Sequence, residues 1–138
     1  MIRLRTAAWH GDELVELTFP AEWEVVEHWP RTPPPLSDDA IRAALEQPVG
    51  QAPIRELCRS KSHPVIIVDD LCRPTPAGRV MPFVLEQLHQ GGIRPEQVTI
   101  LLATGTHGAT SPGWLEKKLA AKLRRVAGAS SMTPGGAA

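Results

Sequence analysis

Hydrophobic and polar residues alternate in the first part of the chain, a pattern typical of strands with one face in water. Ile2–Arg5 alternates throughout, and Leu14–Phe19 does so in part. Between them, His10–Asp12 has the composition of a hairpin turn. A third short strand is predicted at Trp23–Val26, after Pro20. The pattern therefore predicts an N-terminal antiparallel β-hairpin region.

The middle of the chain differs, with two runs of mainly apolar residues at Pro64–Val68 and Val98–Ala103. Strands that are apolar on both faces belong in a parallel sheet covered by helices. Between the runs, Ala77–Gln90 has apolar residues at helical spacing and ends at a pair of glycines. Pro82 predicts a kink or a broken first turn in this helix. Strand, helix and strand together predict an α/β fold containing a Rossmann-like βαβ unit with parallel strands.

Further helices are predicted on both sides of this unit. Ser37 is a suitable N-cap for one helix, and a second short helix is expected to start at Pro53. A last helix is predicted from Ser111 to Val126, with a basic face that we expect to be solvated. That face consists of Lys117, Lys118, Lys122, Arg124 and Arg125. We predict one α/β domain over residues 1–126, incomplete because it has only two strongly buried strands, and a disordered tail over residues 127–138.

Composition excludes several classes of protein. The chain has 138 residues with 15 basic and 15 acidic side chains, and this balance argues against a dedicated nucleic-acid binder. No apolar run reaches the ~18 residues of a transmembrane helix, and the N-terminus does not resemble a secretory signal. Because Cys58 and Cys72 are the only cysteines, no disulfide framework is possible and a cytoplasmic location is expected. We expect neither nucleic acid nor membrane among the partners.

Polar residues follow both predicted parallel strands, where ligands bind in an open parallel sheet. The first loop is Asp69–Pro76 and the second is Thr104–Gly108. An arginine can hold a carboxylate or phosphate through paired hydrogen bonds, and a histidine can move a proton near neutral pH. The side chains expected to share this crevice are Asp70, Arg73, Thr106 and His107. The sequence therefore predicts a site for a small anionic substrate.

Some of these features also have structural interpretations. Asp70 could simply cap the turn after its strand, and Asp69 is expected to be structural or solvated. The basic face of the last helix could bind phosphates instead of only facing water. No metal site is predicted, because the histidines have no ligand-like spacing to one another.

The sequences of the two loops also carry a family resemblance. Residues 70–76 read D-L-C-R-P-T-P and residues 103–107 read A-T-G-T-H. They resemble the D-x-T-R-P-x-P and A-T-G-x-H motifs of the lactate racemase family, the nickel-pincer-cofactor enzymes. Residues 40–50 resemble that family's short helix ending in N-P-I-G, and residues 53–57 resemble the segment that follows it. Several matched segments in the same order are more specific than either loop alone.

The resemblance implies a 2-hydroxy-acid racemase or epimerase that uses proton and hydride transfer with a nickel pincer nucleotide. His107 would match an acid–base histidine, Arg73 the arginine that binds the substrate carboxylate, and Asp70 the acidic residue that opens the same loop. Leu71, Cys72 and Thr106 complete the predicted substrate- or cofactor-binding set. Cys72 stands at the usual threonine position. It could act as a nucleophile with a pKa lowered by Arg73, but a neutral substitute for threonine is the simpler interpretation.

The resemblance covers only part of the family's longer chains. The family's second acid–base histidine, its cofactor-anchoring lysine and its nickel-ligating histidine lie beyond the matched residues. We therefore expect the N-terminal part of such an enzyme, acting on a small 2-hydroxy acid as a homo-oligomer or with a complementing chain. A non-catalytic module that binds a small carboxylate or phosphate, and a truncated inactive fragment, are the alternatives.

Overall fold

The computed structural model describes residues 1–6, 11–105 and 113–119. The chain divides into two compact units, Met1–Leu36 and Ser37–Ala138, which are described separately. The predicted domain limits, 1–126 and 127–138, stay a prediction because residues 120–138 lie outside the described part.

The first unit contains the predicted hairpin. Strands β1 (Ile2–Arg5) and β2 (Leu14–Leu17) pair antiparallel. At the turn, Gly11 has a φ of 100°, which glycine adopts without strain, and Asp12 has a φ of 61°, which aspartate tolerates in turns. An exposed ion pair across the strands joins Arg3 and Glu16 at 2.8 Å. The antiparallel hairpin is therefore confirmed.

The predicted third strand at Trp23–Val26 is wrong, since these residues form no strand. The N–H of Trp23 donates to the carbonyl of Pro20 at 3.1 Å, which closes a turn where the strand was expected. The Phe19 and Trp23 rings lie 6.2 Å apart across that turn. Trp23 stays 61% exposed. Trp23–Val26 pairs with no strand in the described part of the chain, and β-propensity alone does not make a strand.

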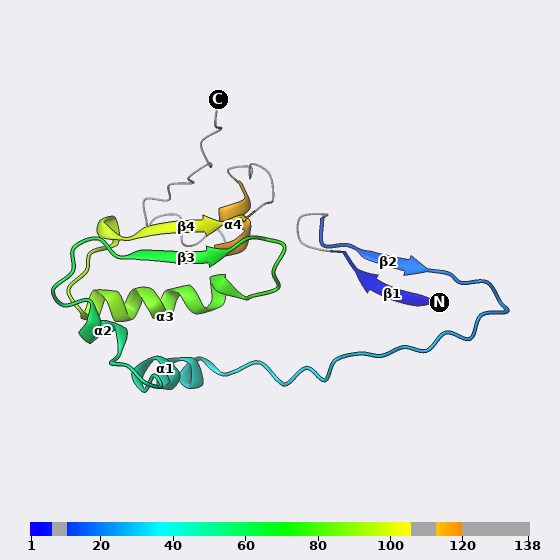
Figure 1. Ribbon diagram of the computed structural model, residues 1–138, viewed down its shortest axis with the longest axis horizontal. Coiled ribbons are helices and arrows are strands. Elements are labelled where there is room, and N and C mark those ends of the chain that lie inside the picture. Colours follow the sequence, from blue (N-terminus) through cyan, green and yellow to red (C-terminus); the bar gives the residue numbers. More distant parts are fainter. Residues whose placement is uncertain (7–10, 106–112, 120–138) are drawn as a thin grey trace, which may run out of the picture. The chain divides into compact units, whose positions relative to one another are not determined.

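The second unit contains the predicted βαβ arrangement (Figure 1). Its elements are α1 (Asp38–Glu46), α2 (Ile54–Leu57), β3 (Val65–Asp69), α3 (Ala77–Gln90), the 3₁₀ turn Pro95–Gln97, β4 (Thr99–Ala103) and α4 (Gly113–Leu119). Strands β3 and β4 are parallel, with Val65 opposite Thr99 and Asp69 opposite Ala103. The α/β class is thus confirmed. Because two parallel strands and one crossover helix occur in several architectures, the narrower Rossmann-like assignment stays a prediction.

Helix α3 begins and ends where the apolar periodicity places it. It runs unbroken through Pro82, so of the two predicted effects the broken first turn is absent, and the kink stays a prediction. Pro82 lies in the second turn, where its missing N–H cannot donate a hydrogen bond to the Gly78 carbonyl. At the other end, the N–H of Ile93 donates to the Leu88 carbonyl at 3.0 Å, and Gly92 has a φ of 91°.

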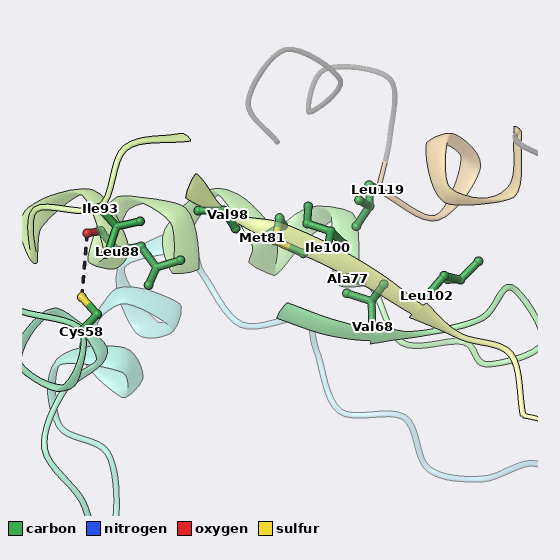
Figure 2. Close-up of a cluster of buried hydrophobic side chains, with 10 residues drawn as sticks. All are labelled: Cys58, Val68, Ala77, Met81, Leu88, Ile93, Val98, Ile100, Leu102 and Leu119. Carbon is green, nitrogen blue, oxygen red and sulfur yellow. Dashed lines mark hydrogen bonds between the residues drawn. The ribbon is translucent and has the colours of Figure 1, made fainter. Parts of the chain in front are cut away.

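The core of this unit lies between α3 and one face of the β3–β4 sheet (Figure 2). Ile100 at its centre is only 1% exposed. On the α2 side, the Cys58 thiol donates to the Leu88 carbonyl at 3.9 Å. The buried members of this cluster are Cys58, Val68, Ala77, Met81, Leu88, Ile93, Val98, Ile100, Leu102 and Leu119.

The opposite face of the sheet is exposed among the described residues. Val65 and Ile67 on β3 are 58% and 67% exposed. The expectation that both faces of this strand are buried is therefore wrong. The reason is that α3 and α4 both pack on the side of Val68 and Ile100.

A polar network attaches α1 and α2 to α3. Gln87, 4% exposed, donates through Nε2 to Glu46 Oε1 at 2.7 Å. The guanidinium of Arg55 forms an ion pair with Glu46, and the Arg55 N–H donates to Gln87 Oε1 at 3.4 Å. Because each partner comes from a different helix, the network fixes how the three helices pack.

Candidate functional site

A cavity lies at the carboxyl edge of the β3–β4 sheet, where the two strands end opposite each other at Asp69 and Ala103. Its volume is about 360 Å³. The lining residues are Ile67, Asp69, Asp70, Arg73, Ala103, Thr104 and Gly105. The structure therefore brings together the starts of both predicted loops, which lie more than thirty residues apart in the sequence.

The buried side chain of Asp70 stabilises the turn at the start of the first loop. Its side chain is buried, and Oδ1 accepts a hydrogen bond from the Cys72 N–H at 2.9 Å. Its carbonyl accepts from the Arg73 N–H at 3.3 Å. These bonds fold the chain into the side-chain-capped turn that aspartate favours. The turn-capping interpretation of Asp70 is thus confirmed, and the same turn brings Arg73 to the cavity.

Lys118 on α4 holds this loop, and the sequence analysis missed it. Its Nζ donates to the carbonyls of Asp70 and Arg73, both at 2.9 Å. The same Nζ lies 3.0 Å from Asp69 Oδ1, and its side chain is only 4% exposed. The expectation that Lys118 belongs to a solvated basic face is therefore wrong. Buried carbonyls need donors, and this lysine supplies two such bonds.

A signal in the sequence could have identified Lys118. It lies three residues after Leu115 and directly before Leu119, at the spacing of the apolar face rather than the polar one. Both leucines pack on the core. Helices α3 and α4 also approach closely, since a Cβ at Gly78 would lie 2.7 Å from the Leu119 carbonyl oxygen. Close packing of α4 on α3 therefore places Lys118 next to the backbone of the first loop.

Asp69 lies at the cavity as an ionised partner of Lys118. Burial raises the pKa of this carboxyl, but hydrogen bonds from Thr75 and Lys118, together with the Lys118 charge, outweigh burial and lower the pKa below its ordinary value of 3.8. The ion pair therefore stabilises the fold above that pH. The stabilisation is lost as the pH falls below about 3.8 towards the folded-state pKa.

The variant Asp69→Asn is expected to lose the pH-dependent stabilisation that this ion pair gives the fold. At pH 7 it should unfold at lower urea concentration than the wild type, and the difference should narrow as the pH falls below about 4. Urea unfolding followed by circular dichroism at pH 7, 4 and 3 measures both midpoints. A difference that is constant over this range would contradict the assigned ion pair.

Leu71 and Cys72 lie outside the cavity lining. Leu71 is buried at 6% exposure. Burial raises the pKa of the Cys72 thiol, and the charge of Asp70 and a hydrogen bond to it raise that pKa further, which outweighs the lowering by Arg73. A raised pKa disfavours the thiolate, so the structure argues against Cys72 as a nucleophile. Ligand contact by Leu71 and Cys72 stays a prediction.

Thr106 and His107 lie outside the described residues. Thr104 and Gly105, which directly precede them, line the cavity. Gly105 has a φ of 59°, a conformation that glycine adopts at no steric cost. The roles of Thr106 and His107 therefore stay predictions.

The described part of the chain shows neither a cluster of metal ligands nor a helix that could span a membrane. Within residues 1–6, 11–105 and 113–119, no three side chains among His, Cys, Asp and Glu gather as metal ligands. None of the helices in this part of the chain is long and apolar enough to cross a membrane.

Comparison with known proteins places these residues in a family. The profile of the lactate racemase N-terminal domain matches residues 10–131. A lactate racemase of Thermoanaerobacterium thermosaccharolyticum is 34% identical over 74 residues, which are 54% of this chain and 17% of that protein. A lactate racemase of Lactiplantibacillus plantarum is 34% identical over 70 residues, 50% of this chain and 16% of that protein. The chain thus aligns with about a sixth of the length of these relatives.

Proposed function

This chain belongs to the lactate racemase N-terminal domain family, and we propose from this premise that its cavity binds the carboxylate of a small 2-hydroxy acid. The observation that carries the proposal is the position of Arg73, which lines a cavity at the carboxyl ends of two parallel strands. A planar guanidinium can donate two parallel hydrogen bonds to one carboxylate. The volume, about 360 Å³, lies near the small end of ligand pockets and suits a small acid.

The wider proposal is that the site serves a lactate racemase-like racemase or epimerase. In that reaction Arg73 holds the carboxylate, and His107 takes the proton of the substrate hydroxyl and returns it. The support for His107 is its place in the loop that begins at the cavity with Thr104 and Gly105. Because the matched relatives are about six times longer than the aligned segment, the complete reaction is proposed for a larger assembly.

The family's nickel pincer nucleotide is a separate proposal. The described residues do not fit the group as its metal site, because no three side chains of metal-binding type gather among them. We therefore assign the described residues to the binding of the substrate. Its metal and its covalent anchor would be held by other residues of the assembly.

The assembly could be a homo-oligomer or could include a complementing chain. The exposed Val65 and Ile67 support an interaction of this kind, since parallel strands are normally covered on both faces. A cytoplasmic location also belongs to the proposal and is supported by two unpaired cysteines, Cys58 and Cys72. Carboxylate binding without turnover is the second candidate, favoured by a described site that contains a cationic anchor.

Titration calorimetry of the full chain tests the proposal. D-lactate and L-lactate are expected to give saturable heats, and lactamide, which has the same shape without the charge, is expected to give none. Equal heats for lactate and lactamide, or none for either, would overturn the carboxylate site. A chiral assay of the same samples separates binding alone from racemisation.

A further inference from the structure

The charges that line the cavity do not favour an anion by themselves. Among the described lining residues, Asp69 and Asp70 each bring a carboxylate and Arg73 brings a positive charge. The formal sum of these three side chains is negative, which opposes a carboxylate ligand. Another positive charge close to the cavity is therefore needed for Arg73 to bind an anion well.

Lys118 supplies that charge from behind the cavity. Its Nζ lies 3.0 Å from Asp69 Oδ1, and it is not among the lining residues. We propose that Lys118 is the positioning residue of this site, which neutralises Asp69 and fixes the Arg73 backbone so that the cavity accepts an anion. This inference rests on the proposed function, because it assumes that the ligand is a carboxylate.

The positioning part follows from the hydrogen bonds. Lys118 donates to the carbonyls of Asp70 and Arg73, so the first and last residues of this turn are attached to one nitrogen. The side chain is only 4% exposed, so little solvent weakens these interactions. A lysine in this position acts on the ligand through Arg73 and Asp69 rather than by contact.

The electrostatic part depends on all charged groups around Asp69. The loop contributes Asp70 and Arg73, and α4 contributes Lys118. From the β4 side, the described lining residues Ala103, Thr104 and Gly105 carry no charge. Lys118 is thus the group that balances the Asp69 charge among the described neighbours of the cavity.

Three variants distinguish the effect of the Lys118 charge from the effect of its hydrogen bonds to the loop. Lys118→Met should weaken lactate binding about tenfold, since it leaves the Asp69 charge facing the ligand at a few ångströms. Asp69→Asn alone should strengthen binding severalfold, because Lys118 keeps its bonds to the carbonyls while the repelling charge is gone. The double variant Asp69→Asn/Lys118→Met should recover part of the affinity, because the Asp69 charge is gone while the bonds from Lys118 to the Asp70 and Arg73 carbonyls are still missing. The control is Lys117→Met, which removes the same charge from an exposed position of α4 and should bind lactate like the wild type.

The dependence of lactate affinity on pH tests the charge of Lys118. If Lys118 only held the loop in place, its replacement would not change this dependence. In Lys118→Met, Asp69 loses its ion pair and titrates at higher pH, so lactate affinity should rise on acidification while lactate remains ionised. Wild-type affinity should stay flat over the same range. Carbon NMR of the Asp69 carboxyl group measures its titration directly in both proteins and needs no ligand.

The outcomes separate this inference from the proposed function. If the wild type binds no lactate, the proposed function fails, and the Asp69 titration still tests the Lys118–Asp69 coupling. If the wild type binds and Lys118→Met binds equally well, the inference is overturned. If Lys118→Met and the double variant bind lactate equally weakly, and circular dichroism shows that both are folded, the charge-balancing role is overturned. An unchanged affinity of Asp69→Asn would do the same.

Discussion

Replacing Arg73 by alanine is expected to reduce lactate affinity by roughly 10- to 100-fold, the range for losing hydrogen bonds to a charged group. Arg73 lines the cavity and is exposed, so its truncation removes the guanidinium without opening the core. The loop backbone should persist, because it is held by Asp70 and Lys118. Titration calorimetry of the full-length variant measures the loss.

Two further substitutions serve as controls for the Arg73→Ala result. Arg73→Lys should retain part of the affinity, since an ammonium keeps the charge but not the paired geometry. Arg59→Ala removes an exposed arginine that does not line the cavity and should bind lactate like the wild type. Wild-type affinity in Arg73→Ala would remove Arg73 from the site and, with it, the proposed function.

Replacing Ile100 by alanine is expected to lower the free energy of unfolding by about 2–5 kcal/mol, the usual cost of truncating a buried aliphatic side chain. Ile100 is 1% exposed and lies at the centre of the cluster between α3 and β4. Since small domains are stable by only about 5–15 kcal/mol, this loss could unfold much of the chain at 37 °C. Urea unfolding followed by circular dichroism measures it.

The matched control is Ile67→Ala. Ile67 is on the parallel partner strand and is 67% exposed, so the same truncation should cost about 1 kcal/mol or less. Similar losses at both positions would show that the exposed sheet face is covered in solution. That result would place the proposed assembly interface on this face of the sheet, whereas a loss of about 1 kcal/mol or less would leave the face open to solvent.

Local patterns predicted most of the βαβ unit. The limits of α3 follow from its apolar periodicity and the glycines after it, because both signals act within a few residues. The cavity was predicted from topology, since parallel neighbours must end at the same edge of a sheet. The arrangement of Asp70 and Arg73 at that edge could therefore be predicted before any coordinates.

The remaining features depend on contacts between distant segments. Which face of β3 is buried is decided by where α3 and α4 pack, and the β3 sequence, apolar on both faces, cannot show it. The raised pKa of Cys72 comes first from burial, which the sequence does not show, and then from Asp70, two residues away. Lys118 reaches Asp69 across 49 positions of the sequence, and only its place in the apolar spacing of α4 gave a signal.

Lactate is expected to bind between the two loops at the carboxyl edge of the β3–β4 sheet. Nitrogen-15 NMR of the full chain, titrated with lactate, tests it most directly. We predict saturable shifts of the Arg73 side-chain Nε–H signal and of the Thr104 and Gly105 amides, with one common Kd and no shift of the Arg59 Nε–H signal. Saturable binding that leaves the Arg73, Thr104 and Gly105 signals unmoved would place lactate elsewhere and contradict the account.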